Sequence, residues 1–134
     1  MKESIKNKFN LEGKVAIITG ASKGIGKSIA KGFIEFGAKV VISSRDQNSL
    51  EEVAKELGQE NILPIQCHVG KDKDIINLVN SVAKTFGRID VLVNNAATNP
   101  FYGELTNTDN ELFDKVINVN LKAPYLLANK CLPF

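Results

Sequence analysis

Short continuous apolar runs alternate along this chain with longer segments in which apolar residues recur every three or four positions. Such runs are typical of strands buried on both faces, and the wider spacing is typical of amphipathic helices. The pattern predicts four strands, at residues 14–19, 39–44, 62–67 and 91–94. It also predicts four helices, at about 24–36, at 47–57, from Asp72 or Asp74 (either of which could cap it) to 86, and from about 109 toward the end.

Strand and helix alternate with short connections, which predicts one α/β domain over residues 11–134 after a polar lead-in at 1–10. Right-handed crossovers give such a chain a parallel, doubly wound sheet with helices on both faces, and the expected strand order is 3-2-1-4. Pro64 lacks an amide hydrogen, so it favours an edge position for the third strand. A ligand crevice is expected at the carboxyl ends of strands one and four, where the winding reverses.

The first predicted strand ends in a glycine-rich turn at residues 19–26, and Ile25, Ile29 and Phe33 then follow at helical spacing. Such a turn lets backbone approach a ligand and aims the first free N–H groups of the helix at it, which suits a pyrophosphate. The residues predicted to bind it are Gly20, Ser22, Lys23, Gly24, Ile25 and Gly26. Glycines also close turns for structural reasons alone, so the triplet by itself leaves that alternative open.

The spacing T-G-x-x-x-G-I-G of this turn resembles that of the short-chain dehydrogenase/reductase family and matches it at every fixed position. The segment Asn94-Asn95-Ala96-Ala97 is similar to the family's N-N-A-G, and the resemblance covers about residues 11–124. It implies a Rossmann-type fold, of which this chain holds the N-terminal portion, and a nicotinamide dinucleotide as cofactor. Segments 43–45, 67–70 and 94–101 resemble in particular the family's NADP-dependent carbonyl and retinal reductase branch.

A positive charge follows the second predicted strand, where Ser44 and Arg45 stand. In dinucleotide-binding folds an acidic residue at this place holds the ribose hydroxyls, and this chain has none at the strand end. Arg45 can form a bidentate pair with a phosphate monoester, and Lys23 could add a second cation. The sequence therefore favours NADP(H) over NAD(H). The alternative is a solvated Arg45 that pairs with Asp46.

The resemblance implies further cofactor contacts at the ends of strands three and four. His68 and Val69 stand where the family commonly has an Asp and a hydrophobic residue against the adenine, and an imidazole can donate to adenine or stack on it. Asn94, Asn95 and Ala96 suit a place where backbone approaches the inner ribose and the nicotinamide. The alternatives are a histidine satisfied by the protein itself and asparagines that only form a turn.

The last predicted helix contains Pro124, which has no N–H, so the carbonyl of Asn120 loses its donor within the helix. An unpaired carbonyl needs another partner, which favours either a bound water at Asn120 or a plain helix kink. In the family the matching Asn holds a water that links a catalytic Lys to solvent. The resemblance therefore assigns a catalytic role to Asn120.

Catalysis in the family also needs a Ser and a Tyr-x-x-x-Lys pair, whose Tyr passes a proton to the carbonyl oxygen. The only tyrosines here, Tyr102 and Tyr125, are followed four positions later by Thr106 and Asn129. Neither has the Lys that would lower a phenol's pKa from about 10. We therefore expect the cofactor half of a reductase, cut off before its catalytic half. Strand four would then be an exposed apolar edge, which predicts partial disorder, poor solubility or association through it.

Composition narrows the classes of protein. Of 134 residues 43% are hydrophobic and 24% charged, with a net charge of +2, which favours a soluble globular protein and gives no reason to expect nucleic acid or a membrane as partner. No apolar run could span a bilayer, and the N-terminus lacks the apolar centre of a signal peptide. Cys67 and Cys131 are expected to be packing thiols of a reduced, cytoplasmic protein, with no metal site.

Three functions remain open from the sequence. The first is an NADP-dependent oxidoreductase, homo-oligomeric in its intact form, that transfers hydride between the nicotinamide and a small carbonyl or alcohol substrate. The second is a non-catalytic nucleotide-binding or assembly module, because the catalytic residues are absent. The third is a methyltransferase using S-adenosylmethionine, a cofactor without a pyrophosphate, for which Arg45 and Lys23 would serve no purpose.

Overall fold

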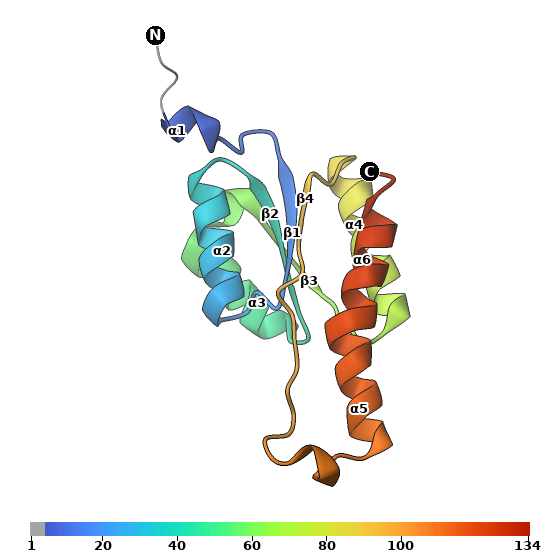
Figure 1. Ribbon diagram of the computed structural model, residues 1–134. Helices are drawn as coiled ribbons and strands as arrows, with labels where there is room; N and C mark the ends of the chain where they lie inside the picture. The colour runs from blue at the N-terminus through green and yellow to red at the C-terminus, as the bar shows by residue number, and fades with distance from the viewer. Residues whose placement is uncertain (1–4) are drawn as a thin grey trace.

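The computed structural model describes residues 5–134 and shows a parallel sheet between two layers of helices (Figure 1). The strands are β1 (Val15–Thr19), β2 (Lys39–Ser44), β3 (Ile62–Gln66) and β4 (Val91–Val93). Their order is β3-β2-β1-β4, so the predicted order and the predicted α/β class are confirmed. β3, which contains Pro64, lies at an edge as its sequence indicated.

The helices follow the predicted segments closely. They are α2 (Gly24–Glu35), α3 (Gln47–Leu57), α4 (Asp72–Phe86), α5 (Asn110–Ile117) and α6 (Ala123–Cys131), with short 3₁₀ turns η1 (Gln59–Asn61) and η2 (Leu105–Asn107). A four-residue helix, α1 (Ile5–Lys8), lies in the lead-in predicted at 1–10, of which residues 1–4 are outside the described part. No helix in residues 5–134 combines the length and apolar character needed to cross a membrane.

Two apolar cores form because the central strands are covered on both faces. On one face α2 and α3 pack against Ile18, Val40 and Ile42. On the other, α4 and α6 pack against Ile17 and Val41 (Figure 1). All five residues of β1 are buried, which explains why its sequence is a continuous apolar run instead of an alternating one.

The start of α4 differs from the prediction that Asp72 or Asp74 caps it. The N-cap is Lys71, which makes no side-chain capping bond. Both carboxylates are engaged elsewhere: Asp72 pairs with Lys122 Nζ at 2.9 Å, and Asp74 Oδ2 accepts from His68 N at 3.0 Å. They still lie in the first turn of α4, where negative charge is favourable.

The long C-terminal helix is interrupted by a π-helical segment, η3 (Asn118–Lys122), directly before Pro124. In this wider turn the N–H of Ala123 donates to the carbonyl of Asn118, five residues earlier. Pro124 cannot donate to Asn120, and its ring would crowd that carbonyl in a regular α-turn. The π-turn therefore accommodates Pro124 within the long helix. Such turns are frequent at functional sites.

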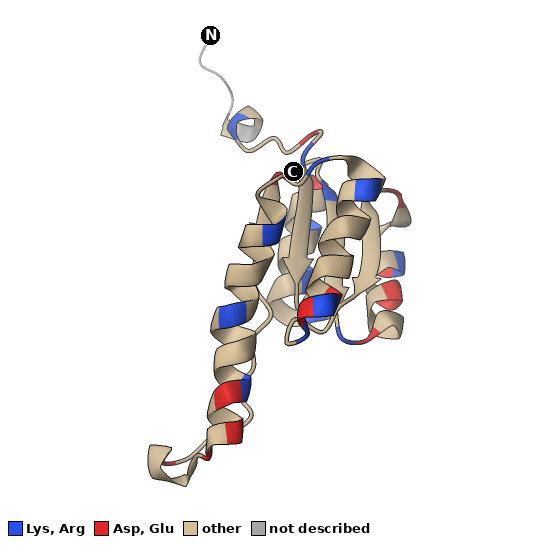
Figure 2. Ribbon diagram, turned by 90° about the vertical axis from the view of Figure 1, so that its right-hand side faces the viewer, with Lys and Arg blue, Asp and Glu red and all other residues tan. Residues whose placement is uncertain are grey.

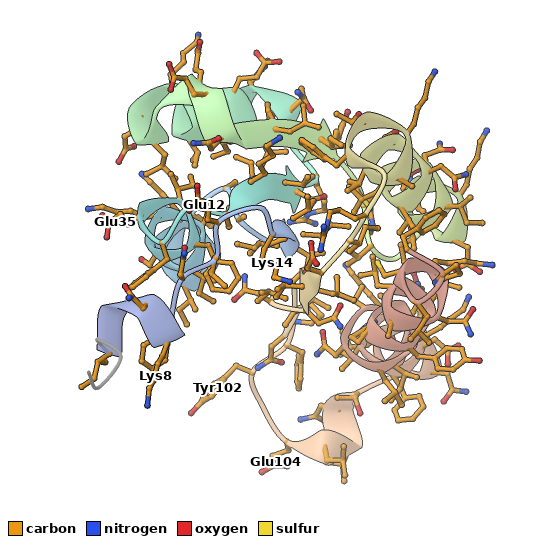
Figure 3. All side chains as sticks on the ribbon, turned by 90° about the horizontal axis from the view of Figure 1, so that it is seen from above. Lys8, Glu12, Lys14, Glu35, Tyr102 and Glu104 are labelled. Carbon is orange, nitrogen blue, oxygen red and sulfur yellow. The ribbon has the colours of Figure 1, made fainter. Side chains whose placement is uncertain are left out.

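Asp90 fastens the start of β4 to the start of β1. Its Oδ2 accepts from the Val15 N–H and from Arg88 Nε, at 2.9 and 2.8 Å, and Lys14 Nζ lies 3.5 Å from Oδ1. Hydrogen bonds from Arg88, helped by the Val15 N–H and opposed by burial, hold the Asp90 pKa well below its usual range. These bonds lie at the amino ends of the strands, the end seen in Figure 3 with Lys14 labelled.

The Asp90 contacts predict a stability that depends on pH. Because the folded pKa lies below the unfolded value of about 3.9, the stabilisation is complete above about pH 5 and is lost as the pH falls through the acid range. Replacing Asp90 by Asn should lower the free energy of unfolding at pH 7 by about 1 to 2 kcal/mol. Urea unfolding of both proteins should show this difference shrinking below pH 4; a constant difference would contradict it.

Candidate functional site

The glycine turn after β1 leaves the N-terminus of α2 open. Gly20 and Gly24 have φ of +64° and +59°, left-handed values that disfavour other residues. The N-cap, Lys23, makes no side-chain capping bond, and the first turn of α2 contains no acid. An uncapped helix start carries partial positive charge and free N–H groups, so this turn can bind an anion.

The third glycine of the turn serves packing. A Cβ on Gly26 would lie 2.5 Å from the Gly20 carbonyl oxygen and 2.6 Å from Asn95 Nδ2. By contrast, a Cβ on Gly24 would meet nothing within 4 Å. Gly26 thus lets α2 approach the end of β1 closely, and it faces the protein itself. Ile25, one position earlier, is 73% exposed, whereas Ile29 and Phe33 pack against the core.

Asn95 holds the turn from the neighbouring strand. Its Nδ2 donates to the carbonyls of Thr19 and Gly20, at 2.9 and 3.1 Å. The buried Thr19 Oγ1 in turn accepts from the N–H groups of Asn95 and Ala96, at 3.1 and 3.0 Å. Asn95 was predicted to contact the cofactor; its side-chain donor is occupied by the protein. Its role in the structure is to position the turn.

Arg45 and Asp46 follow the end of β2, and their side chains have different roles. Asp46 is the N-cap of α3: its Oδ1 accepts from Asn48 N at 3.0 Å and its Oδ2 from Ser49 Oγ at 2.7 Å. The Ser49 bond, with the backbone bonds, lowers the Asp46 pKa. The Arg45 carbonyl accepts from Gln66 Nε2, and within residues 5–134 its guanidinium makes no ion pair. The alternative pairing of Arg45 with Asp46 is therefore not formed.

Two asparagine side chains of the π-turn form hydrogen bonds with loops at the carboxyl ends of the strands. Asn120 Oδ1 accepts from the Thr98 N–H and its Nδ2 donates to the Thr98 carbonyl, both at 2.8 Å. Asn118 Nδ2 donates to the Gly70 carbonyl, also at 2.8 Å. Asn120 thus fixes the loop after β4 and Asn118 the loop after β3. The role of Asn118 was not predicted, although its place two residues before Asn120 is visible in the sequence.

These loops surround a cavity of about 980 Å³ at the carboxyl ends of the strands. Most residues predicted to bind the cofactor line it: Gly20, Ser22, Lys23, Gly24, Ile25, Ser44, Arg45, His68, Val69, Asn95 and Ala96. Three predicted site residues, Gly26, Asn94 and Asn120, do not line it. Lys115 and Val119 complete one wall, and they were missed although they stand four residues apart on one predicted helix.

Cys67 also lines the cavity but is a poor nucleophile. Burial, and to a lesser degree the negative charge of Asp74, raises its pKa to about 11. Cys131 is buried as well, and burial raises its pKa to about 11. Both are free thiols in the structure. In the described part of the chain, no cluster of three His, Cys, Asp or Glu side chains is placed to hold a metal ion.

The strand order and the central glycine turn define a Rossmann-type fold, in which the ligand crevice lies where the winding reverses. The sequence model of the protein family described as short chain dehydrogenase matches residues 14–134 of this chain. The chain belongs to this family of oxidoreductases. The resemblance seen in the sequence is thereby confirmed.

Individual relatives agree with this assignment. Dehydrogenase/reductase SDR family member 4 of Pongo abelii is 41% identical over 125 residues, which are 92% of this chain and 45% of that protein. A metagenomic short-chain oxidoreductase in complex with NADP is 39% identical, with a TM-score of 0.87, over 92% of this chain and 57% of its own. A 3-ketoacyl-(acyl-carrier-protein) reductase from Brucella melitensis complexed with NADH is 40% identical, with a TM-score of 0.87, over 92% and 50%. The chain spans about half the length of the curated relatives it matches.

Proposed function

We propose that this chain is the NADP(H)-binding part of a short-chain dehydrogenase that reduces a small carbonyl compound or oxidises the alcohol. The observation that carries the choice of NADP(H) is the guanidinium of Arg45, which has no ion-pair partner in residues 5–134 and lines the same cavity as the open start of α2. Relatives that bind NADP and NADH both match, so they support a nicotinamide cofactor without selecting between the two.

Residues at the carboxyl ends of neighbouring strands would contact different parts of such a cofactor. The turn after β1, with its uncapped helix start and Lys23, would hold the diphosphate. Arg45 would hold the 2′-phosphate as a bidentate partner. The loop after β4, fixed by Asn95 and Asn120, would position the nicotinamide end. The bound nicotinamide supplies or accepts the hydride, and Asn120 would act through the loop that it holds.

Binding experiments test this proposal without any need for turnover. The chain is titrated with NADPH, NADH and S-adenosylmethionine by isothermal calorimetry. We expect NADPH to bind most tightly, NADH more weakly and S-adenosylmethionine not at all. A non-catalytic nucleotide-binding module would bind NADPH equally well, so this titration tests the choice of cofactor and not the hydride transfer. Tighter binding of NADH or of S-adenosylmethionine would refute the proposal.

We further propose that two copies of the chain associate through the outer face of α5–α6. Phe113, Ile117, Leu121 and Tyr125 are exposed and recur every four residues, so they form one apolar stripe. Acidic residues lie toward the α5 end and lysines toward the α6 end (Figure 2). An antiparallel pairing of two copies, as in a two-fold dimer, would place the apolar stripe of one copy against that of the other.

Replacing Leu121 by Glu is expected to convert the dimer to a monomer, because a charge in the middle of the stripe would have to be buried. Sedimentation velocity over a range of concentrations measures the change. Ile76→Glu is the matched control, since Ile76 is an exposed isoleucine on α4 outside the stripe. Equal effects of the two variants, or a monomeric parent chain, would refute this interface.

A further inference from the structure

A carboxylate, that of Asp46, lies next in the chain to the guanidinium of Arg45. Both residues line the cavity at the carboxyl ends of the strands, and both are exposed. A carboxylate at this position could pair with Arg45 or repel a phosphate bound there. Within residues 5–134, however, Arg45 makes no ion pair. The two charges are therefore held apart by other contacts.

The start of α3 engages both oxygens of the Asp46 carboxylate. Oδ1 accepts from the Asn48 N–H at 3.0 Å, and Oδ2 accepts from the Ser49 hydroxyl at 2.7 Å. The Ser49 bond is the shorter of the two and is the largest cause of the lowered Asp46 pKa. The carboxylate is thus ionised at neutral pH and is held at the N-terminus of α3, where negative charge is favourable.

These two bonds differ in what they require of the sequence. The Asn48 N–H is a backbone donor, which every residue except proline supplies at that position. The Ser49 hydroxyl is a side-chain donor in the first turn of α3, and most residue types have none to offer there. Without it, the Asp46 carboxylate would lose its shorter hydrogen bond and could rotate from the helix start toward the cavity, which Ser49 also lines.

Other contacts fix the backbone around these side chains. The Arg45 carbonyl accepts from Gln66 Nε2 at 2.8 Å, which ties the end of β2 to β3. The Asp46 N–H donates to Ser44 Oγ at 3.3 Å. Neither bond involves Ser49, so loss of its hydroxyl should change the direction of a charged side chain and leave the path of the main chain as it is.

We propose that Ser49 is a positioning residue for cofactor choice: its hydroxyl holds the Asp46 carboxylate at the start of α3, which leaves the Arg45 guanidinium free for the 2′-phosphate of NADP(H). This inference rests on the proposed function. A released carboxylate would compete with the phosphate for Arg45 and repel it. It could also accept from the ribose hydroxyls of NADH. Ser49 thus acts on the choice between the two cofactors through Asp46.

Removing the hydroxyl with and without the carboxylate's charge separates this role from stabilisation of α3. NADPH and NADH are titrated calorimetrically into the parent chain, Ser49→Ala, Asp46→Asn and the double variant. We expect Ser49→Ala to weaken NADPH binding about three- to fivefold, as for one exposed charge interaction, and to leave NADH within about twofold. In the Asp46→Asn background the same change should alter neither affinity by more than about twofold, because no charge remains to be released.

Two further measurements show whether the hydroxyl is the cause and the 2′-phosphate the target. Ser49→Thr keeps a hydroxyl at this position and should retain the parent's ratio of NADPH to NADH affinity. Adenosine 2′,5′-bisphosphate should bind Ser49→Ala more weakly than it binds the parent, and adenosine 5′-monophosphate should bind both equally. Circular dichroism verifies that each variant is folded.

The other outcomes each contradict the inference. If Ser49→Ala lowers both affinities equally, or lowers that for NADPH as much when Asp46 is Asn, Ser49 only stabilises the start of α3. Weaker NADPH binding by Asp46→Asn alone would show that the carboxylate does not oppose the phosphate. If the parent chain fails to bind NADPH, the proposed function fails and this inference with it. A parent that prefers NADPH, with the same preference in Ser49→Ala, refutes only the inference.

Discussion

Replacing Gly26 by alanine is expected to lower the free energy of unfolding by about 2 to 4 kcal/mol. The added Cβ would lie 2.5 Å from the Gly20 carbonyl oxygen and 2.9 Å from Ala21 Cα, both backbone atoms of a turn that cannot move freely. It would also lie 2.6 Å from Asn95 Nδ2 and so displace the amide from the two carbonyls to which it donates. Urea unfolding followed by circular dichroism measures the loss.

Gly32 provides a control within the same helix. A Cβ there would meet nothing within 4 Å, and its φ is not left-handed. Gly32→Ala should therefore raise the free energy of unfolding by up to about 1 kcal/mol, because alanine favours the helix. The two variants make the same chemical change in α2 and should shift stability in opposite directions. If Gly26→Ala were as stable as Gly32→Ala, close packing could not be the reason for glycine at position 26.

The sheet could be predicted from the sequence because its cause is local and repeated. Each strand is a short apolar run, each helix an amphipathic segment, and the crossovers have a fixed hand. With the doubly wound arrangement of dinucleotide-binding folds, these features predict the order 3-2-1-4 that is found. The missing N–H of Pro64 also correctly predicted an edge position for β3. These features depend on periodicity and on one missing N–H, which a sequence displays directly.

Side-chain partners were harder to predict because they depend on distant residues. The sequence of Asn94 and Asn95 does not say which side chain turns toward the glycine turn, and only Asn95 donates to Thr19 and Gly20. Pro124 indicated a lost donor at Asn120, but the π-turn that results also brings Asn118 to Gly70. The contacts of Asp72 and Asp74 likewise depend on Lys122 and the loop after β3, and these override capping.

Replacing Arg45 by alanine is expected to weaken NADPH binding about 10- to 100-fold and to leave NADH binding within about twofold. The guanidinium lines the cavity and has no ion-pair partner within residues 5–134, so its removal breaks no protein contact of that kind. A hydrogen bond to a charged group is worth about 1.5 to 3 kcal/mol, which corresponds to this range of affinities. Calorimetric titration with each cofactor measures both numbers.

Two further variants show whether the charge acts on the 2′-phosphate. Arg45→Asp should weaken NADPH binding further than alanine does and favour NADH, because a carboxylate repels the phosphate and can accept from the ribose hydroxyls. Arg88→Ala removes the same type of side chain before β4, at the opposite end of the sheet, and should leave the ratio of NADPH to NADH affinity unchanged. Adenosine 2′,5′-bisphosphate should follow NADPH, and adenosine 5′-monophosphate should follow NADH. If Arg45→Asp kept the parent's preference for NADPH, another residue would have to hold the phosphate. Lys23 and Lys115, which line the same cavity, would be the first to examine.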